Sequence, residues 1–135
     1  MKAFKFSIPL TVRVNDLNYG NHVSHQNFFS YFQESRVGYL NQFGYTELDI
    51  DGYGMIMAEA GCTYRQSLFL NDPIRVACGV TELKSKRFTM VYQIERADVI
   101  CAEGFTLNIC YDYQSKKVVR LPEEFIRQVK AFEGL

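Results

Sequence analysis

The chain lacks a net charge, a long apolar segment and any clustering of its cysteines. Its 15 Lys and Arg balance its 15 Asp and Glu, so no long-range field would steer a polyanion such as nucleic acid to it. No stretch approaches the roughly 20 apolar residues of a membrane span, and the opening residues lack a signal peptide's apolar core and cleavage site. We therefore expect a cytoplasmic protein that binds no nucleic acid and does not insert into a membrane.

The distribution of the cysteines argues against a metal site. They stand singly in apolar, strand-like runs, with no Cys-x-x-Cys pair and no His nearby: Cys62, Cys78, Cys101 and Cys110. Zinc requires clustered ligands, and structural disulfides belong to secreted chains. The sequence predicts four reduced, buried thiols, with no metal and no bound cofactor.

Apolar patterns divide the chain into one long helix and several strands. Apolar residues at every second position predict a strand over 4–14, and Pro9, which cannot donate to a ladder, marks it as an edge strand. A stripe of apolar residues at helical spacing predicts a helix over 26–43, with Ser24 as N-cap and Gly44 as its stop. The later segments are predicted as four strands and a short helix, over 55–70, 74–83, 88–96, 99–113 and 123–132.

Short turns between consecutive strands predict antiparallel pairing, and a single apolar-faced helix has only the sheet to pack against. We therefore expect an α+β fold formed by one domain over residues 1–135. A five-stranded antiparallel sheet wraps around one long central helix, and a short C-terminal helix follows. Several strands carry apolar residues on both faces, which favours a homo-oligomer.

The residues suited to chemistry gather at positions 16–32, reading DLNYGNHVSHQNFFSYF. An acid at the end of the first strand leads into a turn of Asn, Gly and His, which opens directly into the aromatic-rich helix. Both histidines of the chain, His22 and His25, lie here. This stretch resembles the opening motif of hotdog-fold acyl-CoA thioesterases, and the most similar branch is the hydroxybenzoyl-CoA thioesterase-like group.

The resemblance covers essentially the whole chain. The later matching segments are Glu34-Ser35-Arg36, Tyr64 with Pro73, Ser85 with Phe88, and Val119-Arg120-Leu121-Pro122. The chain departs from the family pattern at Asn21, where Gly is common, and at Ser24-His25, where two Asn are usual. The resemblance implies a hotdog fold and a homodimer or homotetramer with active sites at the subunit interface. It also implies hydrolysis of a small or medium acyl-CoA, aromatic or aliphatic, or of an acyl-carrier-protein thioester, with CoA as part of the substrate.

The same resemblance assigns the catalytic roles. It implies that Asp16 is the nucleophile or the general base. It also implies that backbone amides at the helix start, near Val23, Ser24 and His25, form the oxyanion hole. A thioester carbonyl is already electrophilic, so one base or nucleophile and one stabiliser of negative charge suffice. From spacing alone we favour a structural role for Asp16, as a turn former or helix-side cap, and the resemblance reverses this preference.

Several other side chains have two interpretations each. His22 could orient the acyl group or water, or cap the loop. Asn18 could position Asp16 or form an Asx turn. Glu59, expected on the strand facing the helix, could be a second catalytic carboxylate or, as we favour, the partner that neutralises Arg36. The candidates for contact with the substrate are Asn18, His25, Phe28, Tyr31 and Glu59.

A basic turn is the candidate for binding the phosphates of CoA. It comprises Lys84, Ser85, Lys86 and Arg87. A solvated hairpin turn would have the same composition, so both interpretations stay open.

Two other classes of function also stay open. A hotdog hydratase or dehydratase would place Asp, Asn and His near a helix. The hydratase pattern, however, sets His five residues after Asp and Pro after Asn, whereas here His22 lies six after Asp16 and Tyr19 follows Asn18. A non-catalytic binder of acyl or aromatic ligands on the same fold would differ only in turnover.

Overall fold

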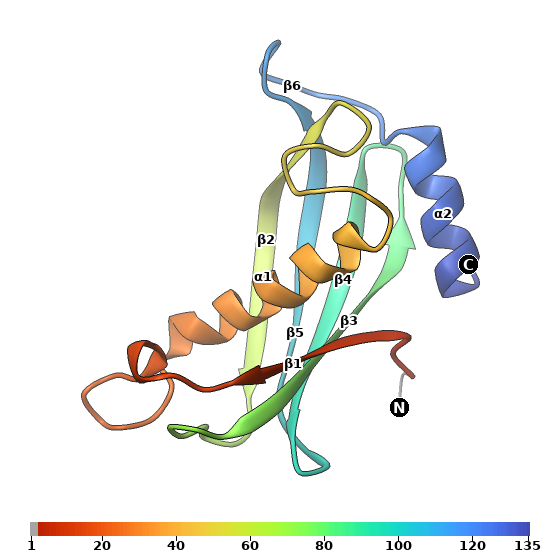
Figure 1. Ribbon diagram of the computed structural model, residues 1–135. Helices are drawn as coiled ribbons and strands as arrows, with labels where there is room; N and C mark the ends of the chain where they lie inside the picture. The colour runs from red at the N-terminus through yellow and green to blue at the C-terminus, as the bar shows by residue number, and fades with distance from the viewer. Residues whose placement is uncertain (1–2) are drawn as a thin grey trace.

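A computed structural model describes residues 3–135, in which a curved antiparallel sheet wraps around one helix (Figure 1). In chain order the elements are β1 (Phe6–Thr11), the 3-10 turn η1 (Val14–Asp16), α1 (His25–Asn41), β2 (Gly54–Tyr64), β3 (Pro73–Leu83), β4 (Arg87–Arg96), β5 (Val99–Asp112), β6 (Lys117–Val118) and α2 (Glu123–Glu133). This is the predicted α+β arrangement, with the central helix and the short C-terminal helix both present.

The strands pair in the order β1-β3-β4-β5-β2, antiparallel throughout, and β6 pairs with the end of β5. Pro9 lies in β1, at an edge as predicted, where the sheet tolerates its missing N–H. The prediction of five strands did not include β6. Only Lys117 and Val118 pair there, with Asp112 and Tyr111, and two residues are too few to leave a periodic pattern.

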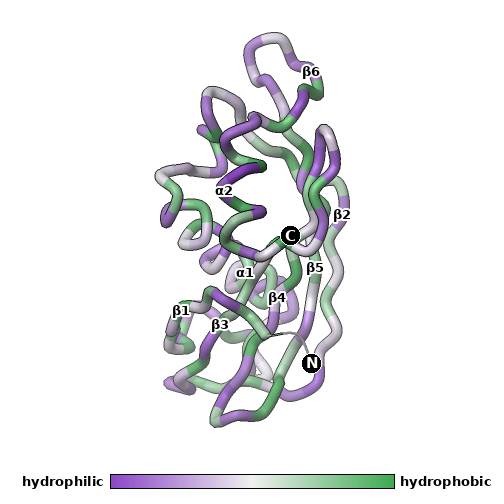
Figure 2. Tube along the Cα trace, turned by 90° about the vertical axis from the view of Figure 1, so that its right-hand side faces the viewer, coloured by the Kyte–Doolittle hydropathy of each residue, from purple (hydrophilic) through white to green (hydrophobic). Residues whose placement is uncertain are grey.

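Both helices lie on the same face of the sheet (Figure 2), and aromatic rings hold them there. Phe32 of α1 stacks on Tyr92 of β4, with 4.7 Å between ring centroids. Gly104 of β5 makes room for this ring, because a side chain at that position would clash with Phe32. Phe125 of α2 packs against Phe88 of β4 at 5.1 Å. The core therefore lies between the sheet and the helices.

The first strand is shorter than predicted. Its ladder ends at Thr11, and Val14, expected on the buried face, is 68% exposed in η1. The backbone N–H of Arg13 donates to the Asp16 carboxylate at 3.0 Å. This contact closes the 3-10 turn and takes the chain out of the sheet, which an alternation pattern cannot register.

Helix α1 begins one residue before the predicted start and ends at Asn41, two residues before the predicted end. Gly44 does mark the stop: its φ is +84°, and the N–H of Tyr45 turns back to the carbonyl of Leu40 at 3.0 Å. A left-handed residue just after a helix favours glycine because it carries no Cβ.

Strand β2 ends at Tyr64, whereas the prediction continued to residue 70. The N–H groups of Arg65 and Gln66 both donate to the carbonyl of Cys101, at 2.8 and 3.1 Å, and turn the chain away from the sheet. Leu68 is fully buried in the loop that follows. Its burial explains why this segment has the composition of a strand.

The four cysteines are free, as predicted. Three of them are buried, but Cys62 on the edge strand β2 is only half-buried. Within residues 3–135, no helix combines the length and the apolar character needed to cross a membrane.

Candidate active site

Asp16 is a buried carboxylate held by three hydrogen bonds. It is 4% exposed and ends η1. Its Oδ2 accepts the backbone N–H of Arg13 at 3.0 Å and the O–H of Tyr31 at 2.9 Å, and its Oδ1 accepts the side-chain amide of Asn27 at 3.1 Å. Burial and the neighbouring carboxylate raise the pKa of Tyr31, so this phenol remains a donor. Because a carboxylate has about four acceptor positions, Oδ1 retains one.

Asn27 connects Asp16 to the helix start, although it was not among the predicted site residues. Its Oδ1 accepts the O–H of Ser24 at 2.8 Å while its amide donates to Asp16. Ser24 is the N-cap residue, as predicted, but its side chain caps no backbone N–H. The sequence did contain a signal for this role of Asn27. It lies one turn before Tyr31, so both side chains project from the same face of the helix.

The helix start offers two free amides. The N–H of Val23 donates to a carbonyl of the β2–β3 loop at 2.9 Å, and that of Ser24 donates to the carbonyl of Asp16 at 3.0 Å. The N–H groups of Val23 and Ser24 therefore already have acceptors and connect the helix start to neighbouring segments. We had expected these two groups to face an oxyanion. Among residues 3–135 the amides of His25 and Gln26 have no acceptor, as is usual in the first turn of a helix.

Two hollows flank the start of α1. The Asp16 hollow, of about 570 Å³, lies on the β1 side, and the His22 hollow, of about 180 Å³, lies next to the end of β2. The predicted site residues are divided between them. Asp16 and Tyr31 line the first hollow, and the second is lined by His22, Val23, His25 and Phe28.

Neither Asn18 nor His22 forms a hydrogen bond with the carboxylate of Asp16. The Oδ1 of Asn18 accepts the N–H of Gly20 at 2.8 Å, which is the Asx-turn arrangement. The Nδ1 of His22 lies 3.2 Å from the carbonyl oxygen of Val23. Asn18 therefore shapes the loop, and His22 borders the smaller hollow.

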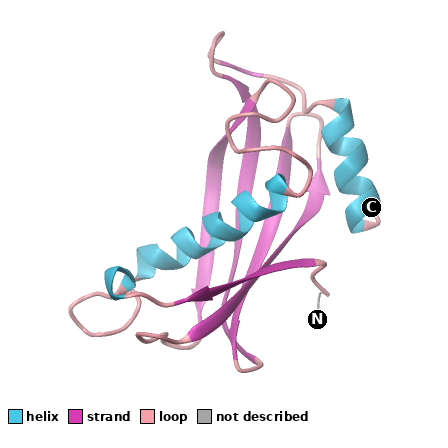
Figure 3. Cartoon of the chain, in the orientation of Figure 1, coloured by secondary structure: helices cyan, strands magenta, loops and turns pink. Residues whose placement is uncertain are grey.

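Glu59 is not the partner of Arg36, and its predicted position facing the helix is wrong. A bulge between Met57 and Glu59 shifts the register, so that Glu59 pairs with Leu107 and is exposed. A bulge of this kind turns the following side chains to the other face of the sheet. The loop between α1 and β2 (pink in Figure 3) supplies the acid instead, since Glu47 Oε2 accepts the Nε–H of Arg36 at 2.7 Å.

The β3–β4 turn, which carries the basic residues, lies beside α2 and away from the start of β3 (Figure 1). The turn, with all four residues exposed, joins β3 to β4 beside α2, whereas Pro73 at the other end of β3 lines the Asp16 hollow. At about 3.3 Å per residue, the strand rises roughly 33 Å from Pro73 to Leu83. Within one chain, Lys84, Ser85, Lys86 and Arg87 are therefore not part of the site around Asp16.

The groups gathered at the helix start can perform acyl transfer. A carboxylate with a free lone pair can accept a proton from water or attack a carbonyl carbon. Free amides at a helix N-terminus can hold the negative charge that develops on the carbonyl oxygen. No three His, Cys, Asp or Glu side chains of residues 3–135 gather as a set of metal ligands.

Comparison with known proteins assigns the family. The model of the thioesterase-like superfamily matches residues 12–129. The chain therefore belongs to this superfamily, its fold is the hotdog fold, and thioester hydrolysis is the class of activity that the membership assigns to it.

Individual relatives agree with this assignment. A protein of Aquifex aeolicus (strain VF5) named "Putative esterase" is 29% identical over 110 residues, which cover 80% of this chain and 84% of that one. A hypothetical protein from Thermus thermophilus is 25% identical, with a TM-score of 0.87 over 95% of this chain and 99% of that one. A second Thermus thermophilus protein, a thioesterase crystallised with coenzyme A and Zn, has the same fold. It is 21% identical, with a TM-score of 0.87 over 100% of this chain and 98% of that one.

Proposed function

We propose that the protein hydrolyses the thioester of a small or medium acyl-CoA, aromatic or aliphatic, with Asp16 as nucleophile or general base. The observation that carries this proposal is the Asp16 carboxylate, which borders a hollow of about 570 Å³ and retains one free lone pair. It lies at the start of a helix whose first two amides have no acceptor among residues 3–135. The coenzyme A bound to the Thermus thermophilus thioesterase supports CoA as the carrier. An acyl-carrier protein presents the same thioester and is the alternative carrier.

Asp16 has two chemically balanced routes. As a general base, Oδ1 takes a proton from water while the water oxygen bonds to the carbonyl carbon; the C–S bond then breaks, and the sulfur takes this proton from Asp16 and leaves as the thiol. As a nucleophile, Oδ1 bonds to the carbonyl carbon and forms an anhydride while the C–S bond breaks and the thiolate leaves. Water then cleaves the anhydride, which restores the Asp16 carboxylate and gives the free acid, whose proton passes to the thiolate. On both routes Arg13, Asn27 and Tyr31 fix the carboxylate in place.

The amides of His25 and Gln26 form the oxyanion hole in this proposal. They are the first two helical residues, where the helix dipole places partial positive charge. A single donor of this kind is worth about 100- to 1000-fold in rate. The side chains of His22, His25 and Phe28 contact the part of the substrate that extends into the His22 hollow.

A homodimer that pairs the β2 edges would complete the CoA site. Residues 57–60 of this edge are exposed, and an exposed edge strand is a template for pairing. β2 begins at the end of the sheet that carries the basic turn and ends beside the helix start, where the O–H of Tyr64 donates to the carbonyl of His25 at 3.2 Å. Antiparallel pairing about a two-fold axis brings the partner's basic turn to the end of the sheet where this chain's α1 begins.

A non-catalytic binder of acyl or aromatic ligands is the second candidate. The observation that favours it is the 4% exposure of Asp16, whose hydrogen bonds would also suit a purely structural carboxylate. Both candidates share the expected cytoplasmic location, with which the four free thiols agree.

Release of free thiol from a panel of acyl-CoAs tests the proposal. Asp16→Asn keeps the shape of the side chain but removes its charge, so we expect thiol release to fall by about 100- to 10,000-fold. The control is Asp98→Asn, an exposed acid in the β4–β5 turn, which should retain full activity. Unchanged release in Asp16→Asn would remove this residue from the mechanism. Tight binding of the acyl-CoAs without release from any of them would favour the binder.

A further inference from the structure

The side chain of Arg13 places a positive charge next to the Asp16 carboxylate. Its Nη2 lies 4.0 Å from Asp16 Oδ1, and both residues line the Asp16 hollow. The other charged residue in the wall of this hollow is Glu34. Arg13 is therefore the only cation among the described residues that line it. The mechanism above uses the backbone N–H of Arg13 but leaves the guanidinium without a role.

Two hydrogen bonds fix the backbone of Arg13 relative to Asp16. The N–H of Arg13 donates to Asp16 Oδ2 at 3.0 Å, and the N–H of Asp16 donates to the carbonyl oxygen of Arg13, also at 3.0 Å. The guanidinium therefore stays within one side-chain length of the carboxylate. Its charge acts on the site, because burial and Asp16 raise the pKa of Tyr31 whereas Arg13 opposes this rise.

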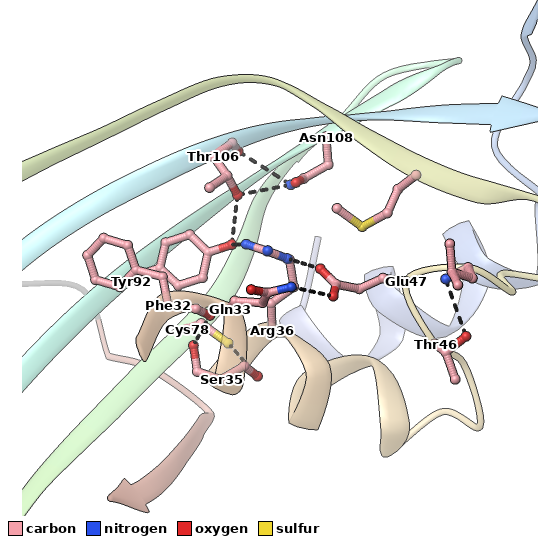
Figure 4. Close-up of polar contacts among 12 residues, drawn as sticks. Phe32, Gln33, Ser35, Arg36, Thr46, Glu47, Cys78, Tyr92, Thr106 and Asn108 are labelled. Atoms are coloured by element: carbon pink, nitrogen blue, oxygen red, sulfur yellow. Dashed lines mark hydrogen bonds and ion pairs between the residues drawn. The ribbon is translucent and has the colours of Figure 1, made fainter. Parts of the chain in front are cut away.

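A comparison with Arg36 shows that the donors of Arg13 are free. The buried guanidinium of Arg36 donates through Nε–H to Glu47 at 2.7 Å and through Nη1–H to Tyr92 at 2.9 Å (Figure 4). These bonds join α1 to the following loop and to the sheet. The side chain of Arg13 is 77% exposed, and Asp16 is the only acid of residues 3–135 within 4.0 Å of it. A guanidinium carries five N–H donors, so Arg13 can donate to a ligand without breaking an existing hydrogen bond.

The separation of the two side chains suits a thioester carbonyl between them. A distance of 4.0 Å between Nη2 and Oδ1 is too long for a hydrogen bond. A carbonyl carbon ready for attack lies about 3–3.5 Å from the attacking oxygen, and its own oxygen is about 1.2 Å away. A donor that stabilises this oxygen lies about 2.7–3.1 Å from it. These three lengths together span 4.0 Å, so one carbonyl can contact Oδ1 through its carbon and Arg13 through its oxygen.

The free amides of α1 do not duplicate this contact. His25, which carries one of them, lines the His22 hollow next to the end of β2, whereas Arg13 and Asp16 share the hollow on the β1 side. The helix start also offers only partial charge, whereas a guanidinium carries a full charge at every working pH. Arg13 therefore adds a charged donor on the flank that the helix amides do not line.

We infer that Arg13 is a further catalytic residue of the proposed thioesterase, whose guanidinium donates hydrogen bonds to the carbonyl oxygen of the substrate as negative charge develops there. This oxygen gains the π-electron pair of the C=O bond when Oδ1 or water bonds to the carbonyl carbon, and it returns the pair when the C–S bond breaks. Arg13 transfers no proton in either step. The inference rests on the proposed function and adds a charged side chain to the oxyanion hole.

Steady-state kinetics of Arg13→Ala on two substrates tests the inference. The substrates are an acyl-CoA and the N-acetylcysteamine thioester of the same acyl group, which lacks the phosphates of CoA. We expect kcat to fall about 10- to 100-fold on both, less than for a buried oxyanion donor because solvent and salt screen the exposed charge. KM should stay within about threefold of the wild type, as expected for an interaction made only in the transition state. Arg13→Ala retains the backbone N–H that donates to Asp16.

Chemical rescue separates the role of the charge from a structural role. Because the side chain of Arg13 is exposed, its removal leaves a space that is open to solvent. Added methylguanidinium should therefore raise the kcat of Arg13→Ala several-fold and leave the wild type and Asp16→Asn unchanged. The matched control is Arg75→Ala, an exposed arginine of β3 that donates to Ser7 Oγ at 2.7 Å. This variant should keep the wild-type kcat and should not respond to methylguanidinium.

A wild-type kcat in Arg13→Ala would overturn the inference, and so would a reduced kcat that methylguanidinium does not restore. A rise in KM confined to the acyl-CoA, with kcat unchanged, would also overturn it, because Arg13 would then bind the phosphates of CoA. Arg13→Gln gives the same comparison of kcat and KM if Arg13→Ala does not fold. Unchanged thiol release in Asp16→Asn would contradict the proposed function, whereas loss of release in Asp16→Asn with a wild-type kcat in Arg13→Ala would contradict this inference alone.

Discussion

Two carboxylate–tyrosine pairs hold the two ends of α1. At the start, Asp16 accepts the O–H of Tyr31 and a backbone N–H from Arg13. Toward the other end, Glu133 of α2 accepts the O–H of Tyr39 at 2.6 Å and the backbone N–H of Val80 at 2.9 Å. The two carboxylates therefore use the same types of donor.

What differs is the space around them. Asp16 borders a hollow of about 570 Å³ and keeps a free lone pair. Glu133 packs against β3, so closely that a Cβ at Gly79 would lie 3.1 Å from its carboxylate oxygen. A half-buried carboxylate packed against a strand, like Glu133, holds two elements together, whereas one that borders a hollow, like Asp16, can meet a substrate.

The largest expected contrast is between Asp16→Asn and Glu133→Gln. The first should abolish most thiol release, as described above, and the second should leave release within about twofold of the wild type. Glu133→Gln should instead lower the free energy of unfolding by about 1–3 kcal/mol, because it weakens hydrogen bonds to a charged group. Thiol release and urea unfolding of both variants measure the contrast. If Asp16→Asn and Glu133→Gln lost activity equally, the proposed difference between a catalytic Asp16 and a structural Glu133 would be wrong.

The two tyrosines give a smaller contrast. Tyr31→Phe removes one of three donors to Asp16, and we expect kcat to fall about tenfold, the effect of losing about 1.4 kcal/mol of positioning. Tyr39→Phe should leave kcat and KM unchanged while costing stability in the same range as Tyr31→Phe. Steady-state kinetics separates the two, and a kcat for Tyr31→Phe equal to that of Tyr39→Phe would contradict the positioning role.

Alkaline pH should affect both ends alike. Burial, together with Asp16 for one and Glu133 for the other, raises the pKa of Tyr31 and Tyr39 above the ordinary value of about 10. The unfolded chain therefore releases these protons first. The stability that Tyr31 and Tyr39 contribute to the folded state is fully present below about pH 10 and is lost as the pH rises above it. Melting temperatures across this range should decline, and less steeply in either Tyr→Phe variant; a decline that neither variant changes would refute the assignment.

The smallest expected effect is in the β4–β5 turn. Ala97 and Asp98 have φ of 50° and 66° in a two-residue turn that prefers Asn-Gly. Replacing them together, Ala97→Asn with Asp98→Gly, should raise the free energy of unfolding by about 1 kcal/mol and leave thiol release unchanged. Chemical denaturation measures the gain. Altered activity here would mean that global stability, rather than local geometry, controls turnover.

Much of the fold could be predicted because periodicity reports burial directly. The helix stripe around Phe32 and the alternation in 88–96 correspond to α1 and β4. The resemblance at 16–32 also led to the correct family. What failed was local: Val14 left the strand because of the Arg13–Asp16 contact, and β6 is only two residues long.

The candidate site was harder to predict than the fold. Asn27 was not predicted, although it shares a helix face with Tyr31, and the sequence could not distinguish the amides that stay free from those of Val23 and Ser24. The acid for Arg36 was assigned to Glu59 because the bulge before it is invisible in sequence. Each of these depends on which groups meet across the chain.

The sequence by itself determined the order of helix and strands, the absence of a net charge and the membership of a thioesterase-like family, because composition, periodicity and motif are properties of neighbouring residues. Only the tertiary structure decided that Glu47 pairs with Arg36, that Asp16 and His22 face different hollows, and that one oxygen of Asn108 stays unpaired. Hydrogen bonds and cavities form between residues distant along the chain, and a bulge of one residue redirects every side chain that follows it.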